Sequence, residues 1–173
     1  SLAVDSYSEL AALASRVTRL MSEAAGVAAS PAFAASDFAA LGISGVTAEN
    51  LAEVLAAIRA SADDGSDIDT LSELQILVAA AVAQSRQDAI DRISQYDGTS
   101  STTTPTLADY ANAGVNGVSV NNLLSINSAF AEIALADSNT TASIQGVVTG
   151  YVAILLGADG QSDGDLSLTA SGY

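Results

Sequence analysis

The sequence lacks cysteine, histidine, tryptophan and lysine altogether. Without cysteine, the 173-residue chain can form neither a disulfide framework nor a reactive thiolate. Without histidine, cysteine and lysine, it also lacks the side chains that most often act as general bases or activated nucleophiles. Carboxylate pairs such as Asp63 and Asp64 remain, but they lie in a predicted solvated loop where nothing would desolvate them. The composition therefore predicts a protein that is not an enzyme and carries no cofactor.

Positive charge and long hydrophobic runs are also scarce. Five arginines stand against 20 acidic residues, which gives a formal net charge of −15. Because phosphate binding needs basic clusters, we expect no nucleic-acid partner. The two long uncharged stretches, 111–131 and 138–158, are interrupted by asparagine and glutamine, so we expect no membrane insertion. Strong acidity is typical of soluble, self-repelling surface proteins, and we expect a secreted monomer.

The sequence does contain an internal repeat. Residues 37–51 (DFAALGISGVTAENL) return 72 residues later as residues 109–123 (DYANAGVNGVSVNNL). Two shorter matches extend it: Ser8-Glu9-Leu10 with Ser72-Glu73-Leu74, and 170–173 with 35–38. Self-similarity at a fixed spacing is typical of an array of modules. We expect the chain to be a piece of a longer repeat protein, beginning inside one copy and holding two whole copies.

Capping signals and apolar periodicity predict helices throughout. Ser6-Tyr7-Ser8-Glu9 is a capping box that opens a long helix over about 7–27. Its expected buried face consists of residues that recur at helical spacing and is flanked by Leu13 and Leu20. The members of this face are Tyr7, Leu10, Ala14, Val17, Met21 and Ala24.

Each copy of the repeat is predicted to contain one short and two longer helices. In the first copy, Ser30-Pro31 is expected to start the short helix, Thr47 to cap the next, and Thr70-Leu71-Ser72-Glu73 to open a helix ending at Asp97-Gly98. In the second copy, the short helix is expected to end at Gly114, and Ser119 is expected to cap the next helix. Thr140 or Thr141 is expected to cap the last helix, which would end at Gly157.

We therefore predict an all-α fold of tandem small three-helix bundles, preceded by one long helix from a preceding copy. The long helix would occupy residues 1–29, and the first three-helix module residues 30–98. A Ser/Thr-rich linker at 99–104 would separate it from a second module at 105–158. Residues 159–173 would form an acidic linker and the start of the next repeat.

The repeated motif is aromatic-x-x-x-Gly-(Ile/Val)-x-Gly-Val-(Thr/Ser)-x-x-Asn-Leu, followed by an apolar helix and then by Asp69-Thr70-x-x-Glu73-Leu74-Gln75-x-Leu77-Val78. This pattern resembles the GA-like three-helix modules repeated in very large bacterial surface and biofilm adhesins. Those modules are in turn distantly similar to the albumin-binding GA module, a likeness carried by residues 41–44 and 69–78. The resemblance covers about residues 31–158. It implies a modular adhesin, secreted or held at the bacterial cell surface, often of a calcium-rich type.

Two functions fit this resemblance. In the first, the copies are stalk or spacer modules whose partners are neighbouring repeats of the same chain. In the alternative, a GA-like module binds a host or matrix protein through the face formed by its second and third helices. The second copy is almost uncharged, has Asn127 where the first has Leu55, and carries Gly146 and Gly150 in its third helix. The two copies would therefore not bind one partner equally.

Residues 159–166 partly match a calcium-binding loop. The candidate oxygen ligands are Asp159, Gln161, Asp163 and Asp165. Gly164 stands where such a loop turns, but Ala170 occupies the position of the bidentate acid. A solvated acidic linker is the favoured interpretation, calcium binding is the alternative, and we assign no metal ligand. A second acidic stretch, Asp63, Asp64, Asp67 and Asp69, lacks the glycine spacing, and Asp69 more simply stabilises the start of a helix.

The remaining conspicuous residues are expected to be structural. Asn50 and Asn122 are predicted to bond to the turn before the second helix of each copy rather than to a ligand. Phe38 and Tyr110 are expected to anchor the cores. The other three tyrosines lie on apolar faces and are also expected to be buried: Tyr7, Tyr96 and Tyr151.

Overall fold

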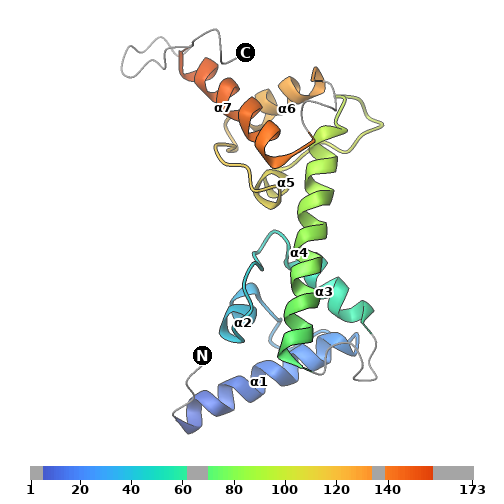
Figure 1. Cartoon of the computed structure of the whole chain (residues 1–173), viewed down its shortest axis with the longest axis vertical. Coiled ribbons are helices and arrows are strands. Elements are labelled where there is room, and N and C mark those ends of the chain that lie inside the picture. The colour runs from blue at the N-terminus through green and yellow to red at the C-terminus, as the bar shows by residue number, and fades with distance from the viewer. Residues whose placement is uncertain (1–5, 62–69, 134–138, 158–173) are drawn as a thin grey trace. The chain divides into compact units, whose positions relative to one another are not determined.

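The computed structural model describes residues 6–61, 70–133 and 139–157 (Figure 1). Over these ranges the chain forms seven α-helices and no strand, which confirms the all-α prediction. The helices are α1 (Tyr7–Ala24), α2 (Ala35–Ala40), α3 (Leu51–Ala60), α4 (Leu71–Ser94), α5 (Leu107–Asn112), α6 (Leu123–Ala131) and α7 (Thr141–Gly157). None of the described helices has the length and hydropathy of a membrane span.

The chain divides into two compact units, residues 1–85 and 86–173, and the division falls inside α4. Each unit has its own hydrophobic core, and each core takes side chains from four helices. The core of unit 1 uses α1, α2, α3 and the N-terminal part of α4. The core of unit 2 uses the C-terminal part of α4 together with α5, α6 and α7. One helix therefore contributes to both cores.

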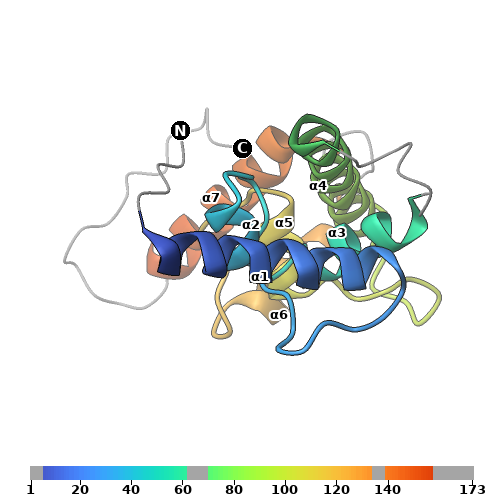
Figure 2. The ribbon, with the colours of Figure 1, turned by 90° about the horizontal axis from the view of Figure 1, so that it is seen from below.

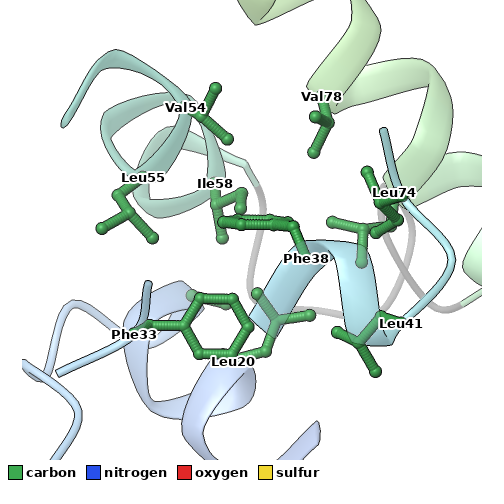
Figure 3. Close-up of a cluster of buried hydrophobic side chains, with 11 residues drawn as sticks. Leu20, Phe33, Phe38, Leu41, Val54, Leu55, Ile58, Leu74 and Val78 are labelled. Atoms are coloured by element: carbon green, nitrogen blue, oxygen red, sulfur yellow. The ribbon is translucent and has the colours of Figure 1, made fainter. Parts of the chain in front are cut away.

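Phe38 lies at the centre of the core of unit 1. Its side chain is fully buried among residues of α1, α3 and α4 (Figure 3). The ring of Phe33 stands edge-on to it, with 4.9 Å between ring centroids and an interplanar angle of 87°. Aromatic pairs prefer this arrangement because the positive ring edge meets the negative ring face. The prediction that Phe38 anchors the core is confirmed.

Helix α1 does not bury the face that its periodicity predicts. It packs against α3 and buries Leu20, Glu23 and Ala24. Apart from Ala24, the predicted face is exposed, and the prediction was wrong for Tyr7, Leu10, Ala14, Val17 and Met21. Periodicity identifies an apolar face but not the element that covers it. Figure 2 shows α1 along its length, in front of α2 and α3.

Three helices begin later than expected. Helix α2 starts at Ala35 rather than at Pro31, because Phe33 enters the core ahead of the helix. Helix α3 starts at Leu51 rather than directly after Thr47, since a turn occupies residues 48–50. Helix α6 shows the same delay, beginning at Leu123 rather than directly after Ser119.

The long helices begin where their capping signals predict. Ser6 and Glu9 form a capping box at α1, and Thr70 and Glu73 exchange the same bonds at α4. At α7 the residue that caps is Thr140: its N–H donates to Ser143 Oγ at 3.0 Å, and the Ser143 N–H donates back to Thr140 Oγ1 at 3.1 Å. Each bond satisfies a donor that a helix N-terminus would otherwise leave unpaired.

Candidate functional site

The candidate calcium ligands are not among the described residues. Asp159, Gln161, Asp163 and Asp165 lie outside the described residues, as do Asp63, Asp64, Asp67 and Asp69. Within the described ranges, no three acidic side chains gather into a set that could hold a metal ion. The feature that the described residues do form, once in each unit, is an ion pair between a long helix and the short helix that follows it.

In unit 1 this ion pair joins α1 to α2. The Arg19 guanidinium donates to both carboxylate oxygens of Asp37, with Nη1–Oδ2 and Nη2–Oδ1 distances of 2.9 and 2.6 Å. The Arg16 Nε lies 3.4 Å from Asp37 Oδ1 without the geometry of a hydrogen bond. Two-point contact between a planar guanidinium and a carboxylate fixes orientation as well as distance. We call this contact, with its counterpart in unit 2, the Arg–Asp junction.

The same carboxylate begins its own helix. Asp37 Oδ2 accepts a bond at 3.0 Å from the N–H of Ala34, which is the N-cap residue of α2 in place of the expected Ser30. The hydrogen bond from Arg19 is the main cause that lowers the pKa of Asp37; burial opposes it, and the Ala34 N–H and the charges of Arg19 and Arg16 add to it. Asp37 therefore stays ionised although it is largely buried.

Unit 2 repeats the Arg–Asp junction between α4 and α5. Arg92 forms an ion pair with Asp109, which is 3% exposed. Asp109 Oδ2 also accepts from the Thr106 N–H at 2.7 Å and from the Thr106 hydroxyl at 2.8 Å, completing a capping box. In both units, therefore, one aspartate caps a short helix and holds it against the preceding long one.

The sequence interpretation missed the Arg–Asp junction, although a signal was present. Arg19 precedes Asp37 by 18 residues and Arg92 precedes Asp109 by 17, and both aspartates open the repeated stretch. All five arginines of the chain lie in helices: Arg16 and Arg19 in α1, Arg59 in α3, and Arg86 and Arg92 in α4. The chain has few arginines, and two of them precede the repeated aspartate by nearly the same number of residues. This spacing indicates that each of the two arginines pairs with the aspartate that follows it.

A second repeated feature is the loop before the middle helix of each unit. Asn50 Oδ1 accepts from the Thr47 N–H at 2.8 Å, and its Nδ2 donates to the Gly45 carbonyl at 3.0 Å. Asn122 makes the equivalent bonds to Ser119 and Gly117 at 2.7 and 2.9 Å. Gly45 and Gly117 have φ values of +90° and +93°, a region that glycine tolerates best. The predicted turn-bonding role of both asparagines is confirmed.

The face of the second and third helices carries a groove in unit 1. It lies between α3 and the N-terminal part of α4, and its volume is about 580 Å³. The lining residues are Ala57, Ala60, Ser61, Glu73, Ile76, Leu77 and Ala80. The matching positions of the second copy include Glu132, Gly146 and Gly150. Most of the residues that line the groove are therefore not preserved in the second copy.

The Ser/Thr-rich segment at 99–104 is tied to Asp97. Asp97 Oδ1 accepts from the hydroxyls of Thr102 and Thr99, at 2.6 and 2.7 Å, and from the Thr99 N–H at 2.9 Å. The Thr102 hydroxyl, followed by the Thr99 hydroxyl and N–H, lowers the pKa of Asp97 to about 2. This acidic side chain thus organises the turn after α4 through ordinary turn chemistry.

Comparisons with protein-family models, with curated proteins and with solved structures found no match to this chain. The chain's described residues repeat three structural features. These are the Arg–Asp junction, the loop closed by Asn50 or Asn122 (the Asn–Gly loop), and a central aromatic residue.

Proposed function

We propose that this chain consists of structural repeat modules, serving as a stalk or spacer of a large secreted bacterial adhesin and having no catalytic role. The observation that supports the proposal is that the Arg–Asp junction occurs in both units: its aspartates occupy equivalent positions, and its arginines precede them by 18 and 17 residues. Selection for a ligand site would repeat exposed groups, whereas both of these aspartates are buried between helices. What the copies share is therefore the means of holding helices together.

In this proposal, the repeating element is a small three-helix bundle completed by the end of the preceding long helix. The short helix and the middle helix contribute the aromatic anchor and the Asn–Gly loop. The following long helix covers them through its first turns, as Leu74 and Val78 do in unit 1. The preceding long helix supplies the arginine. Arrays of such units are stabilised by nearest-neighbour contacts, so they can be extended without a new fold.

The charge of the chain suits this role. A net charge of −15 keeps a long array soluble and opposes lateral association, so neighbouring repeats of the same chain would be its main partners. The likeness of the repeated motif to GA-like adhesin modules supports an extracellular location at the bacterial surface. Acidic segments at 62–69 and 159–165 leave calcium as a candidate stiffening ion.

Solution scattering tests the spacer function. We expect an elongated monomer, and we expect its maximum dimension to increase by a constant step when a further copy of the repeat is added. A compact particle with one continuous core would contradict the proposal. Scattering and thermal unfolding are then measured with and without millimolar calcium, which separates the spacer function from the role of the metal. An unchanged scattering profile and an unchanged melting temperature would exclude calcium stiffening.

The groove of unit 1 favours a second candidate function, binding of a host or matrix protein through the face of the second and third helices. Its exposed apolar residue is Ile76, which is 68% exposed. Titration of albumin and other serum proteins tests this candidate, with Ile76→Glu as the disruptive variant. Leu124→Glu in unit 2, at a residue that is 84% exposed, is the matched control. Binding lost only in Ile76→Glu would support the candidate; no binding would exclude it.

A further inference from the structure

An apolar face of α1 lies open to solvent. We define the α1 stripe as Tyr7, Leu10, Ala14, Val17 and Met21. Tyr7 is 87% exposed, and Leu10, Val17 and Met21 are 55%, 43% and 52% exposed. Single exposed apolar residues are ordinary, but residues that recur at helical spacing form a continuous face. Such a face indicates contact with another element.

The capping boxes give the register that relates α1 to α4. The Ser6 N–H donates to Glu9 Oε2 at 3.0 Å, and the Thr70 N–H donates to Glu73 Oε2 at 2.9 Å. This register places the α1 stripe on the same face as a set of α4 residues. Tyr7, Leu10, Ala14, Val17 and Met21 correspond to Leu71, Leu74, Val78, Ala81 and Ser85.

In α4 this face covers a core. Leu74 is 5% exposed and Val78 is fully buried, and both pack with Phe38 and residues of α3 (Figure 3). The Thr140–Ser143 cap gives α7 the same register, and there Ile144 and Val148 are fully buried in the core of unit 2. Two long helices therefore use their first turns to close the core formed by the short and middle helices that precede them.

Helix α1 contacts its own unit through a different part of its surface. Leu20 and Ala24, near its C-terminal end, enter the core of unit 1, as Ile90 and Ile93 of α4 enter the core of unit 2. The α1 stripe is not needed for that contact. The α1 stripe occupies the positions that α4 and α7 use to cover a core. Among the described residues, however, no core lies against it.

We propose that the α1 stripe is the docking surface for the short-helix and middle-helix pair of another copy of this repeat. This inference rests on the proposed function of the chain as a repeat array. The occupant has a defined chemistry, because it must present an aromatic residue and aliphatic residues like those that α4 covers: Phe38, Val54 and Ile58. None of the five stripe residues is charged, as the wall of an apolar core requires.

An extended chain provides the test. Residues 1–69 are placed directly before residue 6 of the chain, so that a second copy of α1 follows a complete copy of α2 and α3. The amide hydrogen exchange of both α1 copies is then measured. We expect the internal α1 to exchange roughly tenfold more slowly, or slower still, than the terminal α1. Since the two copies share one sequence, their peptides should show two mass populations.

Two alanines of α1 provide a matched pair of variants in the internal copy. Ala14 aligns with Val78, which is fully buried, whereas Ala12 aligns with Ile76, which is 68% exposed. Ala14→Asp should abolish the protection of the internal α1, and Ala12→Asp should preserve it. Equal exchange in both α1 copies, or equal effects of the two variants, would overturn the proposal.

Sedimentation of the original chain tests the competing occupant. A dimer that Ala14→Asp dissociates would show that the α1 stripe binds a second α1 instead, and would overturn the proposal; a monomer supports it. Scattering of the extended chain reports separately on the spacer function. A longer particle with an unprotected internal α1 would retain the spacer function while rejecting this docking surface.

Discussion

The two cores occupy matching positions but fill them differently. In unit 1 the central ring is Phe38, and its ring partner is Phe33. In unit 2 the central ring is Tyr110, and its ring partner is Phe130, with 6.0 Å between centroids. Position 33 corresponds to Pro105, and Phe130 corresponds to Ile58. The second aromatic has therefore moved from the segment before the short helix to the middle helix, while the core keeps a pair of rings.

The second difference is polarity. Where unit 1 has Leu55, unit 2 has Asn127, which is 3% exposed. The Tyr110 hydroxyl donates to Asn127 Oδ1 at 2.8 Å, and Asn127 Nδ2 donates to the Pro105 carbonyl at 2.8 Å. Burial, with smaller contributions from the charges of Asp109 and Tyr96, raises the pKa of the Tyr110 phenol. The two units therefore show that the same arrangement of helices accepts polar side chains in its core when each buried polar group has a hydrogen-bond partner.

The largest expected effect comes from removing a central ring. Phe38→Ala should lower the free energy of unfolding of unit 1 by about 3–5 kcal/mol, because a fully buried ring is lost and a cavity remains. Tyr110→Ala should do the same in unit 2. Hydrogen exchange resolves the two units during denaturant titration. An equal loss in both units from either single variant would contradict the division into separate cores.

The polar core of unit 2 provides the next test. Asn127→Leu should cost about 2–3 kcal/mol, since it leaves the Tyr110 hydroxyl and the Pro105 carbonyl buried without their partner. Adding Tyr110→Phe should recover about 1 kcal/mol by removing one of the unpaired groups. Denaturant titration of the two single variants and the double variant forms a mutant cycle. A strictly additive cycle would show that the two side chains are not coupled.

Removing the charge of one Arg–Asp junction should have a smaller effect. Asp37→Asn keeps the shape of the side chain but loses the ion pair with Arg19, at an expected cost of about 2 kcal/mol to unit 1. Asp109→Asn is the matched variant in unit 2, where Arg92 is the partner. Thermal unfolding measures both. If neither variant shifted the melting temperature, the junction would be a surface contact without structural value.

The smallest predicted effect is a loss of stability of unit 1 at acidic pH. Burial raises the pKa of Glu23, but the Ala29 N–H and Arg59 outweigh it, so the net shift is downward, as it is for Asp37. A lowered pKa in the folded state means that stability is fully present above the unfolded value, about 4, and is lost as the pH falls below it.

Denaturant titration between pH 6 and pH 3 measures this loss. Unit 1 should lose stability over the lower part of the range, and Glu23→Gln should make the loss less steep. Residue 95, which lies 72 positions after Glu23, is an uncharged glutamine in unit 2, so Gln95→Ala is a control that removes no carboxylate. An unchanged slope in Glu23→Gln would show that this carboxylate does not contribute.

Local signals in the sequence predicted the elements well. Helix starts at Ser6, Thr70 and Thr140 follow from hydroxyl-to-backbone bonds within four residues, which the sequence displays directly. The burial of Phe38 and Tyr110 follows from their place in the repeated apolar pattern. Such features need no knowledge of distant parts of the chain.

Features that depend on distant partners were not predicted. The Arg19–Asp37 pair spans a loop, and its formation depends on how α1 and α2 pack. The late start of α2 depends on Phe33 entering a core whose other walls lie elsewhere in the sequence. The exposure of the apolar face of α1 could not be predicted for the same reason. Periodicity shows that a helix has an apolar face but not which element packs against that face.

The confinement of all five arginines to helices has a consequence for proteolysis. Trypsin-like proteases cut after arginine or lysine and need the backbone extended in their cleft. This chain has no lysine, and its arginines in α1, α3 and α4 are held in helical turns. Cleavage therefore has to wait until a helix opens. A protein built this way would resist tryptic digestion while folded, and nicking at Arg59 or Arg92 would report directly on which unit had opened.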